Sequence, residues 1–287
     1  MHPATIAAAY VAACTDELQA LKPGNAHVHA TTHKLSVGQF LASARASAPA
    51  LTQTGAGIGR RILDAVAATQ AAVGTNTNLG IILLCAPLAA VAESLTDISI
   101  PALHAALASA LGALSVDDAA QAFRAIALAA PGGLGRDATH DVHAPATTDL
   151  RTAMASAAGR DRIAFQYAHG FADIFGLGLT ACAQADRNIS PGWRDPQWRT
   201  LLVHLTFLAA FADSHILRRH GAAVAECTRR SAAEMLDRLR GLDDPASLLG
   251  ALHVWDAELK AANINPGTSA DMTVATLFVR RLEPCCR

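Results

Sequence analysis

Hydrophobic positions recur at helical spacing along almost the whole chain, and no segment alternates apolar and polar residues long enough to indicate a strand. Alanine, the strongest helix former, is abundant throughout. The pattern predicts an all-α protein whose polar residues concentrate in the loops. The expected helices cover residues 3–21, 37–48, 56–73, 78–93, 100–112, 116–129, 150–158, 161–184, 195–219, 222–240, 246–262 and 269–282.

Composition fits a large globular core, because 52% of the 287 residues are hydrophobic and only 16% are charged. We expect one large multi-helix domain over residues 1–287, although two closely packed domains would fit the same length. The 23 Lys and Arg residues balance 24 Asp and Glu residues, and no basic stripe is present, which disfavours nucleic-acid binding.

The longest apolar run, residues 80–92, is much shorter than a membrane span needs, so we expect no membrane partner. Residues 1–21 carry acidic side chains and no basic start, which favours a first helix over a signal peptide. The six cysteines show no CxxC spacing, and we expect reduced thiols in a cytoplasmic protein.

The polar loop Asn263-Ile264-Asn265-Pro266-Gly267-Thr268-Ser269-Ala270-Asp271-Met272 separates two apolar helical patterns. Its Pro-Gly step makes a turn, Ser269 is a candidate N-cap, and Asn263, Asn265 and Asp271 crowd oxygen and amide groups around the next helix start. Such a group suits phosphate, ribose or Mg²⁺. The alternative is stability alone, with Asn263 as C-cap, Ser269 as N-cap and Asp271 as a first-turn acid.

A second polar loop runs from Lys22 to His29. Lys22 is a candidate phosphate contact, Gly24 allows close backbone approach to a ligand, and Asn25 offers both a donor and an acceptor. The alternative for Lys22 and Gly24 is an ordinary helix C-terminus with its cation and glycine.

Three histidines belong to the same region: His27, His29 and His33. Zinc is disfavoured, because H-x-H-x₃-H without carboxylate or thiolate partners matches no established ligand spacing. His27 and His33 are instead candidate general bases, since an imidazole titrates near neutral pH.

The very apolar helix expected at 78–93 begins in the polar side chains Asn76, Thr77 and Asn78. Buried amides and hydroxyls need partners, and a bound ligand is one candidate. The alternative is an elaborate N-cap by Asn76 or Thr77.

Two further segments carry charge. Residues 131–137 combine three glycines with Arg136, as in a loop that closes on phosphate. Asp213 follows an apolar run and precedes Arg218, so the carboxylate lies at the edge of the core. Either an ion pair with Arg218 or binding of a metal or substrate would explain it.

Several of these motifs occur together in one known family. The order Lys22-Pro23-Gly24, Asn76-Thr77, Asp213-Ser214 with Arg218 and Gly221, then Asn265-Pro266-Gly267-x-Ser269-Ala270-Asp271 resembles the triphosphoribosyl-dephospho-coenzyme A synthases over nearly the whole chain. The resemblance implies an all-α fold and ATP as donor. It also implies attack of the 2′-hydroxyl of dephospho-coenzyme A on C1 of the ATP ribose, with adenine leaving.

Two departures from the family pattern accompany the resemblance. Asn76-Thr77-Asn78-Leu79-Gly80 stands for Asn-Thr-His-Lys-Gly, and His33-Lys34-Leu35-Ser36 stands for His-x-Asp-Met. Three motifs are similar to a divergent branch of archaea and of methylotrophic bacteria that use tetrahydromethanopterin: Lys22-Pro23-Gly24-Asn25, Asn76-Thr77-Asn78-Leu79-Gly80 and Pro131-Gly132-Gly133-Leu134-Gly135. The resemblance then implies transfer of a (phospho)ribosyl group from ATP or phosphoribosyl diphosphate to a precursor of such a carrier.

Substitution at ribose C1 passes through an oxocarbenium-like state that needs a carboxylate, amides on the hydroxyls and cations on the phosphates. We expect Asp271 and Asp213 as catalytic or Mg²⁺-binding carboxylates, and His27, His33 or His215 as the base. The expected substrate contacts are Lys22, Gly24, Asn25, Asn76, Thr77, Asn78, Arg136, Arg218, Asn265, Gly267 and Ser269.

We therefore predict that residues 22–33, 74–80, 213–221 and 263–271 converge on one cleft for a small nucleotide or sugar phosphate and a coenzyme precursor. Triphosphoribosyl-dephospho-coenzyme A synthesis proper and a non-catalytic accessory protein that kept the fold are the alternatives. A homodimer is left open.

Overall fold

The computed structural model describes residues 1–29, 36–130 and 142–283. These residues form helices and no strands, which confirms the all-α prediction. They divide into two compact units: of the described residues, unit 1 holds 1–14, 38–130, 142–172 and 278–283, and unit 2 holds 15–29, 36–37 and 173–277. The expectation of a single domain stays a prediction.

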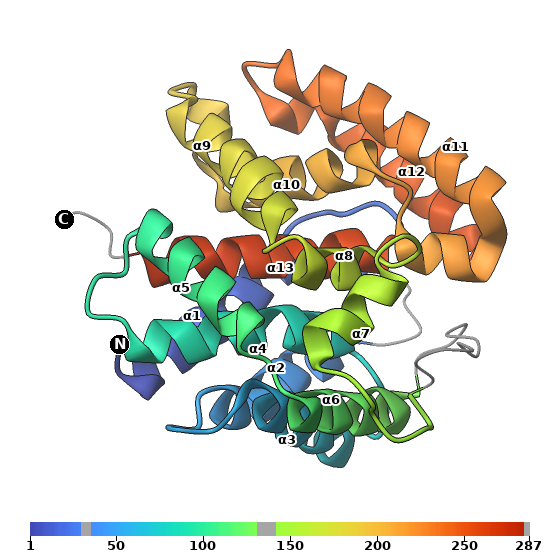
Figure 1. Cartoon of the computed structure of the whole chain (residues 1–287). Helices are drawn as coiled ribbons and strands as arrows, with labels where there is room; N and C mark the ends of the chain where they lie inside the picture. Colours follow the sequence, from blue (N-terminus) through green and yellow to red (C-terminus); the bar gives the residue numbers. More distant parts are fainter. Residues whose placement is uncertain (30–35, 131–141, 284–287) are drawn as a thin grey trace. The chain divides into compact units, whose positions relative to one another are not determined.

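Unit 1 contains most of the first eight helices (Figure 1). Their bounds are α1 Pro3–Gln19, α2 Val37–Leu51, α3 Ile58–Val73, α4 Leu79–Ser94, α5 Ile100–Gly112, α6 Val116–Ala129, α7 Leu150–Ala157 and α8 Arg162–Ala168. The unit boundary falls within α1.

The α3–α6 pair shows how unit 1 satisfies its helix ends. Ser115 and Asp118 form a capping box at the start of α6. The other oxygen of the same carboxylate, Asp118 Oδ1, accepts the amide of Gly59 in the first turn of α3 at 2.8 Å. Gly59 lies very close to the Asp118 backbone, because a Cβ added to Gly59 would come within 2.5 Å of the Asp118 Cα. One carboxylate therefore joins two helix starts.

The central apolar helix α4 contains Pro87, which cannot donate a hydrogen bond to the carbonyl of Leu83 one turn earlier. The hydroxyl of the buried Tyr167 donates to that carbonyl at 2.6 Å instead. A side chain of α8 thus provides the donor that the proline lacks, and the Leu83 carbonyl is paired.

Unit 2 contains the π-helix η1 Ile174–Gly178, followed directly by α9 Leu179–Arg187, and the later helices. These are η2 Pro191–Arg194, α10 Pro196–Ala210, α11 Ser214–Arg240, η3 Pro245–Leu248, α12 Leu249–Ala261 and α13 Gly267–Leu282. The unit boundary falls within α13, whose residues from Phe278 on belong to unit 1. Figure 1 shows α11 and α12 side by side.

Two helix predictions, 161–184 and 195–219, were wrong in detail. The helix expected at 161–184 breaks after Ala168, because Gly170 and Phe171 adopt positive φ values of 63° and 60°. The helix expected at 195–219 ends at Ala210, and Asp213 begins a new helix. That helix continues to Arg240 across Gly221, whose φ of 82° and ψ of 173° break the helical geometry.

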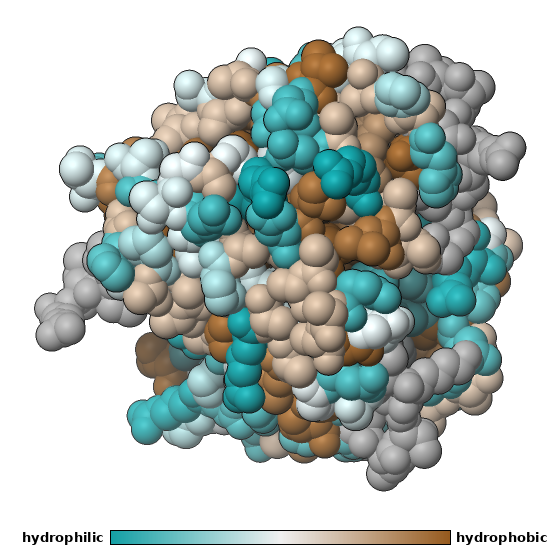
Figure 2. All heavy atoms as spheres, turned by 90° about the horizontal axis from the view of Figure 1, so that it is seen from below, coloured by the Kyte–Doolittle hydropathy of each residue, from teal (hydrophilic) through white to brown (hydrophobic). Residues whose placement is uncertain are grey.

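The surface face in Figure 2 mixes hydrophilic and apolar side chains. Among the described residues, large exposed apolar side chains are spread over several elements, as is normal for a protein surface. They are Val28, Val116, Leu128, Leu177, Ile189 and Val254. No single described helix is long and apolar enough to cross a membrane, although two bent helix pairs meet the length and composition test together.

Gly178 in η1 offers a stability test, because a Cβ there would lie 2.3 Å from Thr276 Oγ1 and 2.8 Å from Phe207 Cζ. We expect Gly178→Ala to lower the free energy of unfolding by about 1–3 kcal/mol through overpacking. Gly176 lies in the same π-helix, where an added Cβ meets nothing within 4 Å, so Gly176→Ala is the matched control. Urea denaturation of both variants checks the expectation, and equal stabilities would contradict it.

Candidate functional site

Asp213 is the fully buried carboxylate at which two helices of unit 2 begin. Its Oδ1 accepts the amides of His215 at 2.9 Å and Ile216 at 3.2 Å, which caps α11. Its Oδ2 accepts both the amide and the hydroxyl of Ser269 in the first turn of α13, each at 2.8 Å. Burial raises the pKa of Asp213, and these hydrogen bonds oppose the rise.

These contacts change two sequence assignments. Ser269 is not the N-cap of α13, because the helix begins at Gly267 and Ser269 donates to Asp213. The four hydrogen bonds to Asp213 occupy the positions at which a carboxylate accepts, so a catalytic or metal-binding role for Asp213 is not supported. Asp213 instead holds the start of α13 against the start of α11.

The loop before α13 contacts the Lys22–His29 loop through two side-chain amides. Asn25 Nδ2 donates to Asn265 Oδ1 at 2.8 Å. Asn263 lies at φ 54° after α12, and the amides of Asn263 and Ile264 donate to the carbonyls of Lys260 and Leu259. This is a Schellman ending in which Asn263 takes the C′ position after the C-cap Ala262, so Asn263 ends the helix much as the sequence offered as the alternative.

Gly24 shows why the sequence Lys-Pro-Gly-Asn folds as it does. The Asn25 amide donates to the Lys22 carbonyl, and Gly24 lies at φ 80°, as in a type II turn with proline and glycine at its centre. A Cβ on Gly24 would come within 2.7 Å of the Ile264 carbonyl oxygen. Both the backbone conformation and the close packing therefore require glycine.

Lys22 is fully buried, and its ammonium donates to the carbonyls of Glu17, Ala20 and Ala26 at 2.5, 3.2 and 2.8 Å. Its Nζ also lies 3.1 Å from Glu17 Oε1. Burial lowers the pKa of Lys22, and the Glu17 carboxyl opposes that shift. All three protons are used within the chain, so the structure favours the helix-terminal role over the expected phosphate contact.

His27 is buried beside two residues of α12 that the sequence analysis missed. Its Nε2 lies 3.3 Å from Asp256 Oδ2 and 3.0 Å from Lys260 Nζ. Burial lowers the pKa of His27, and the nearby Lys260 and Lys22 charges act in the same direction. Its Nδ1 has no hydrogen-bond partner among the described residues. A ring this enclosed is better suited to holding the loop than to acting as the expected base.

His215 lies in the first turn of α11, with its ring packed over Gly267 at the start of α13. A Cβ on Gly267 would be 3.2 Å from His215 Nδ1. Burial lowers the pKa of His215 to about 4, assisted by the charges of Arg218, Arg219 and His220. The residue is partly exposed and its ring is neutral at pH 7, the form that can accept a proton, and its Nε2 is buried without a hydrogen-bond partner among the described residues.

Asp271 is partly exposed and follows Gly267 by four residues, beyond the first turn of α13. It is therefore not the first-turn acid that the sequence analysis offered as the alternative. Helix-dipole stabilisation weakens beyond the first turn, so the dipole alone explains this carboxylate less well than it did in the sequence analysis.

Asn76, Thr77 and Asn78 belong to unit 1. Asn76 Oδ1 accepts the amide of Leu79 at 3.1 Å, as in the N-cap alternative. Thr77 bonds to Ser43 at 2.6 Å and Asn78 to Ser47 at 3.4 Å, both in α2. The sequence analysis missed the two α2 serines, because a serine within an apolar helix gives no signal of its long-range partner.

The structure thus joins three of the four polar stretches, 22–27, 213–216 and 263–269, within unit 2. Convergence of residues 74–80 on the same cleft stays a prediction. His33 and Arg136 lie outside the described residues.

A resident Mg²⁺ is not supported by the donors of unit 2. Among the described residues, no group of three or more His, Cys, Asp or Glu side chains is arranged to hold a metal ion. Asp213 is occupied by hydrogen bonds, and Asp271 is the other carboxylate of the expected pair. Mg²⁺ commonly binds through one or two carboxylates together with substrate phosphates, and Asp271 with a triphosphate fits that pattern.

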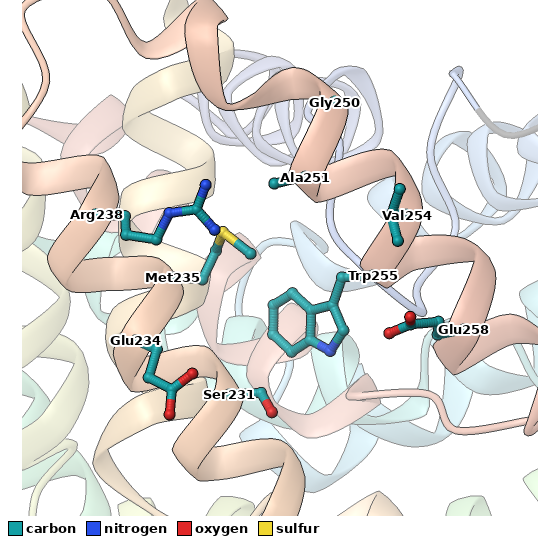
Figure 3. A pocket seen from close by; sticks show the side chains of 9 residues that line it. All are labelled: Ser231, Glu234, Met235, Arg238, Gly250, Ala251, Val254, Trp255 and Glu258. Carbon is teal, nitrogen blue, oxygen red and sulfur yellow. The ribbon is translucent and has the colours of Figure 1, made fainter.

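A pocket of about 400 Å³ lies elsewhere in unit 2, along α11 and α12 (Figure 3). Its lining combines apolar side chains with a charged rim. The residues are Ser231, Glu234, Met235, Arg238, Gly250, Ala251, Val254, Trp255 and Glu258. None of them was predicted as a site residue.

His204 in α10 is fully buried, and neither ring nitrogen has a partner among the described residues. Burial lowers its pKa to about 3, with Lys22 and His27 adding to the effect. The His204 imidazole therefore becomes protonated near pH 6.5 in the unfolded chain but only near pH 3 in the folded chain. The free energy of unfolding falls as the pH drops below about 6.5.

We expect His204→Leu to raise the melting temperature at pH 5 and to flatten its decline between pH 7 and pH 4, because an unpaired buried polar group costs about 1–3 kcal/mol. Scanning calorimetry across this pH range measures both effects. His253 is exposed in α12, so His253→Leu is the control and should leave the slope unchanged. A lower melting temperature with an unchanged slope for His204→Leu would contradict the expectation.

The double cap predicts that Asp213→Asn is costly, because an amide can accept at one helix start only and presents N–H groups to donors at the other. We expect a loss of about 1–3 kcal/mol in the free energy of unfolding. Asp195 caps only α10, from an exposed position, and asparagine caps about as well as aspartate. Asp195→Asn should therefore be nearly neutral in the same urea titration, and equal losses would disprove the double-cap account.

Comparison with known proteins gives one family for the whole chain. Residues 3–286 match the model of the family described as CitG, ATP:dephospho-CoA triphosphoribosyl transferase. A relative from Pseudomonas syringae pv. tomato is 33% identical over 121 residues, 42% of this chain and 39% of its own. One from Citrobacter koseri is 32% identical over 90 residues, 31% of this chain and 29% of its own. Both bear the name of 2-(5''-triphosphoribosyl)-3'-dephosphocoenzyme-A synthase.

These matched segments span less than half the length of either relative. A crystal structure from Archaeoglobus fulgidus, named after triphosphoribosyl-dephospho-coA synthase, has the same fold. Its TM-score is 0.63 at 23% identity, covering 86% of this chain and 98% of that one.

Proposed function

The chain belongs to the ATP:dephospho-CoA triphosphoribosyl transferase family, and from this we propose that it is a transferase acting in coenzyme biosynthesis. It moves a phosphorylated ribosyl group from ATP to an acceptor hydroxyl. The acceptor oxygen bonds to ribose C1 as the bond from C1 to adenine breaks, the acceptor loses its proton to a base, and adenine takes up a proton.

The observation that carries this proposal is the contact between loops far apart in the sequence. The Asn25–Asn265 pair and the Asp213–Ser269 pair bring three of the family-like motifs together in unit 2. Side-chain amides suit ribose hydroxyls and phosphate oxygens. Asp271 supplies a carboxylate for the developing positive charge, and neutral His215 is the base. A set of amides, a carboxylate and a base supports ribosyl transfer more directly than it supports nucleotide binding without catalysis.

For the acceptor we propose a precursor of a tetrahydromethanopterin-type carrier in preference to dephospho-coenzyme A. The position at which family synthases carry a phosphate-binding lysine holds Leu79, which is buried in unit 1 next to the buried Asn78. Incubation with ATP and either acceptor, with chromatography of released adenine, distinguishes the two. Adenine release with dephospho-coenzyme A alone would overturn the acceptor proposal, and release with neither would favour the accessory-protein alternative.

Asp271→Asn separates catalysis from stability. We expect the variant to stay folded, with a cost of no more than about 0.3–1 kcal/mol, and to lose about 10²–10³ in transfer rate because a charge contact in the transition state is lost. Asp117 is a first-turn acid of α6, so Asp117→Asn is the control for a purely helix-terminal acid and should keep full activity. Melting temperature and adenine release are measured on the same preparations. Full activity of Asp271→Asn would remove Asp271 from the proposed mechanism.

A further inference from the structure

Asp256 lies in the middle of α12, one helical turn before Lys260. The two side chains form an ion pair at 2.7 Å, and Asp256 is nearly buried. Residues 251, 254, 255 and 258 of the same helix line the pocket of Figure 3. Their spacing of three and four residues places them on one face of α12, and Asp256 and Lys260 lie off that face, toward the Lys22–His29 loop.

Each oxygen of the Asp256 carboxylate has a different partner in unit 2. Oδ1 accepts the Gly24 amide at 2.9 Å, across 232 residues of sequence. Oδ2 faces the Lys260 ammonium at 2.7 Å and His27 Nε2 at 3.3 Å. Burial alone would raise the pKa of Asp256, but the hydrogen bonds from His27, Lys260 and Gly24 lower it to about 2. The carboxylate is therefore ionised at any pH at which the protein would work.

The Gly24 amide belongs to the residue that immediately precedes Asn25. Gly24 is confined on its other side by the Ile264 carbonyl oxygen and the Leu259 side chain. With the amide held by Asp256 and the α-carbon held by residues 259 and 264, Asn25 meets Asn265 at hydrogen-bond distance. A shift of Gly24 would separate the two asparagines.

We propose that Asp256 and Lys260 are positioning residues that hold the Lys22–His27 loop so that the Asn25–Asn265 pair is set for the ribose or phosphates of ATP. This inference rests on the proposed function. Asp256 acts through the Gly24 amide, and Lys260 acts by holding the Asp256 carboxylate in place.

A purely structural ion pair explains the cluster less well. Replacing a buried ion pair by apolar residues is often neutral or stabilising, so stability alone gives little reason for this one. The pair also lies among further groups that face His27: Lys22, His29 and His204. With the two lysines this close, His27 stays neutral and remains a hydrogen-bond partner for the cluster.

The test compares Asp256→Ala, Asp256→Asn and Lys260→Met. Asp256→Ala removes the acceptor for Gly24, and we expect kcat/KM for ATP to fall about 10²-fold, mainly through KM, because misplacement by about 1 Å has that effect. Asp256→Asn keeps an oxygen for the Gly24 amide and should recover most of the loss. Lys260→Met keeps the hydrogen bond from the Gly24 amide to Asp256 but removes the ion pair. Its kcat/KM for ATP should lie between those of Asp256→Ala and Asp256→Asn.

Asp186→Ala is the matched control, because Asp186 forms an exposed ion pair with Arg199 in unit 2. It should leave KM unchanged. A lowered melting temperature for Asp256→Ala with an unchanged KM for ATP would overturn the proposal, and so would equal losses in the Ala and Asn variants.

Calorimetric titration of the same proteins with ATP separates this inference from the proposed function. If wild-type protein releases no adenine with any acceptor, the proposed function fails. A Kd for ATP that rises in Asp256→Ala and recovers in Asp256→Asn would still support the positioning role. Identical Kd values in wild type and all three variants would overturn it.

Discussion

The buried carboxylate of Asp213 is the constraint on which the arrangement of unit 2 depends. It accepts hydrogen bonds from the first turns of α11 and α13 at once, so neither helix start can move without leaving donors unpaired in the interior. The loop of residues 263–266 is consequently fixed at both ends, by α13 on one side and by the Schellman ending of α12 on the other. The Asn25–Asn265 contact follows from that fixed position.

The buried carboxylates at helix starts also limit which helix starts could bind a phosphate. Helix starts are natural phosphate sites, but those of α11 and α13 are already satisfied by a carboxylate, and Asp118 does the same for α3 and α6 in unit 1. Under the proposed function, we expect a nucleotide in unit 2 to be recognised by side-chain amides, by Asp271 and by cations such as Arg218. The Lys22 ammonium donates to backbone carbonyls, so Lys22 holds the loop in place and does not offer its charge to a phosphate.

The sequence was most informative where the determinant is local. Helical periodicity predicted the all-α class, and Pro-Gly and Asn signals predicted the turn at Lys22–Asn25 and the C-cap at Asn263. It failed where a partner lies far along the chain. Nothing near Asp213 shows that its second helix begins 54 residues later at Gly267, and the amphipathic pattern of α12 hides Asp256, whose partner Gly24 is 232 residues away. The helices expected at 195–219 and 161–184 end early because Phe211 and Gly170 adopt non-helical backbone angles, which hydrophobic periodicity cannot predict.

The position of α12 has a further consequence for the candidate site. One face of this helix lines the pocket through Ala251, Val254, Trp255 and Glu258, while Asp256 and Leu259 contact the Gly24 turn. A helix is stiff over so short a length, so a displacement of α12 would carry Asp256 with it and loosen the Gly24 amide. Met235 of α11 and Trp255 of α12 both line the pocket, so we expect substitutions there that displace α12 to disturb the Asn25–Asn265 pair as well.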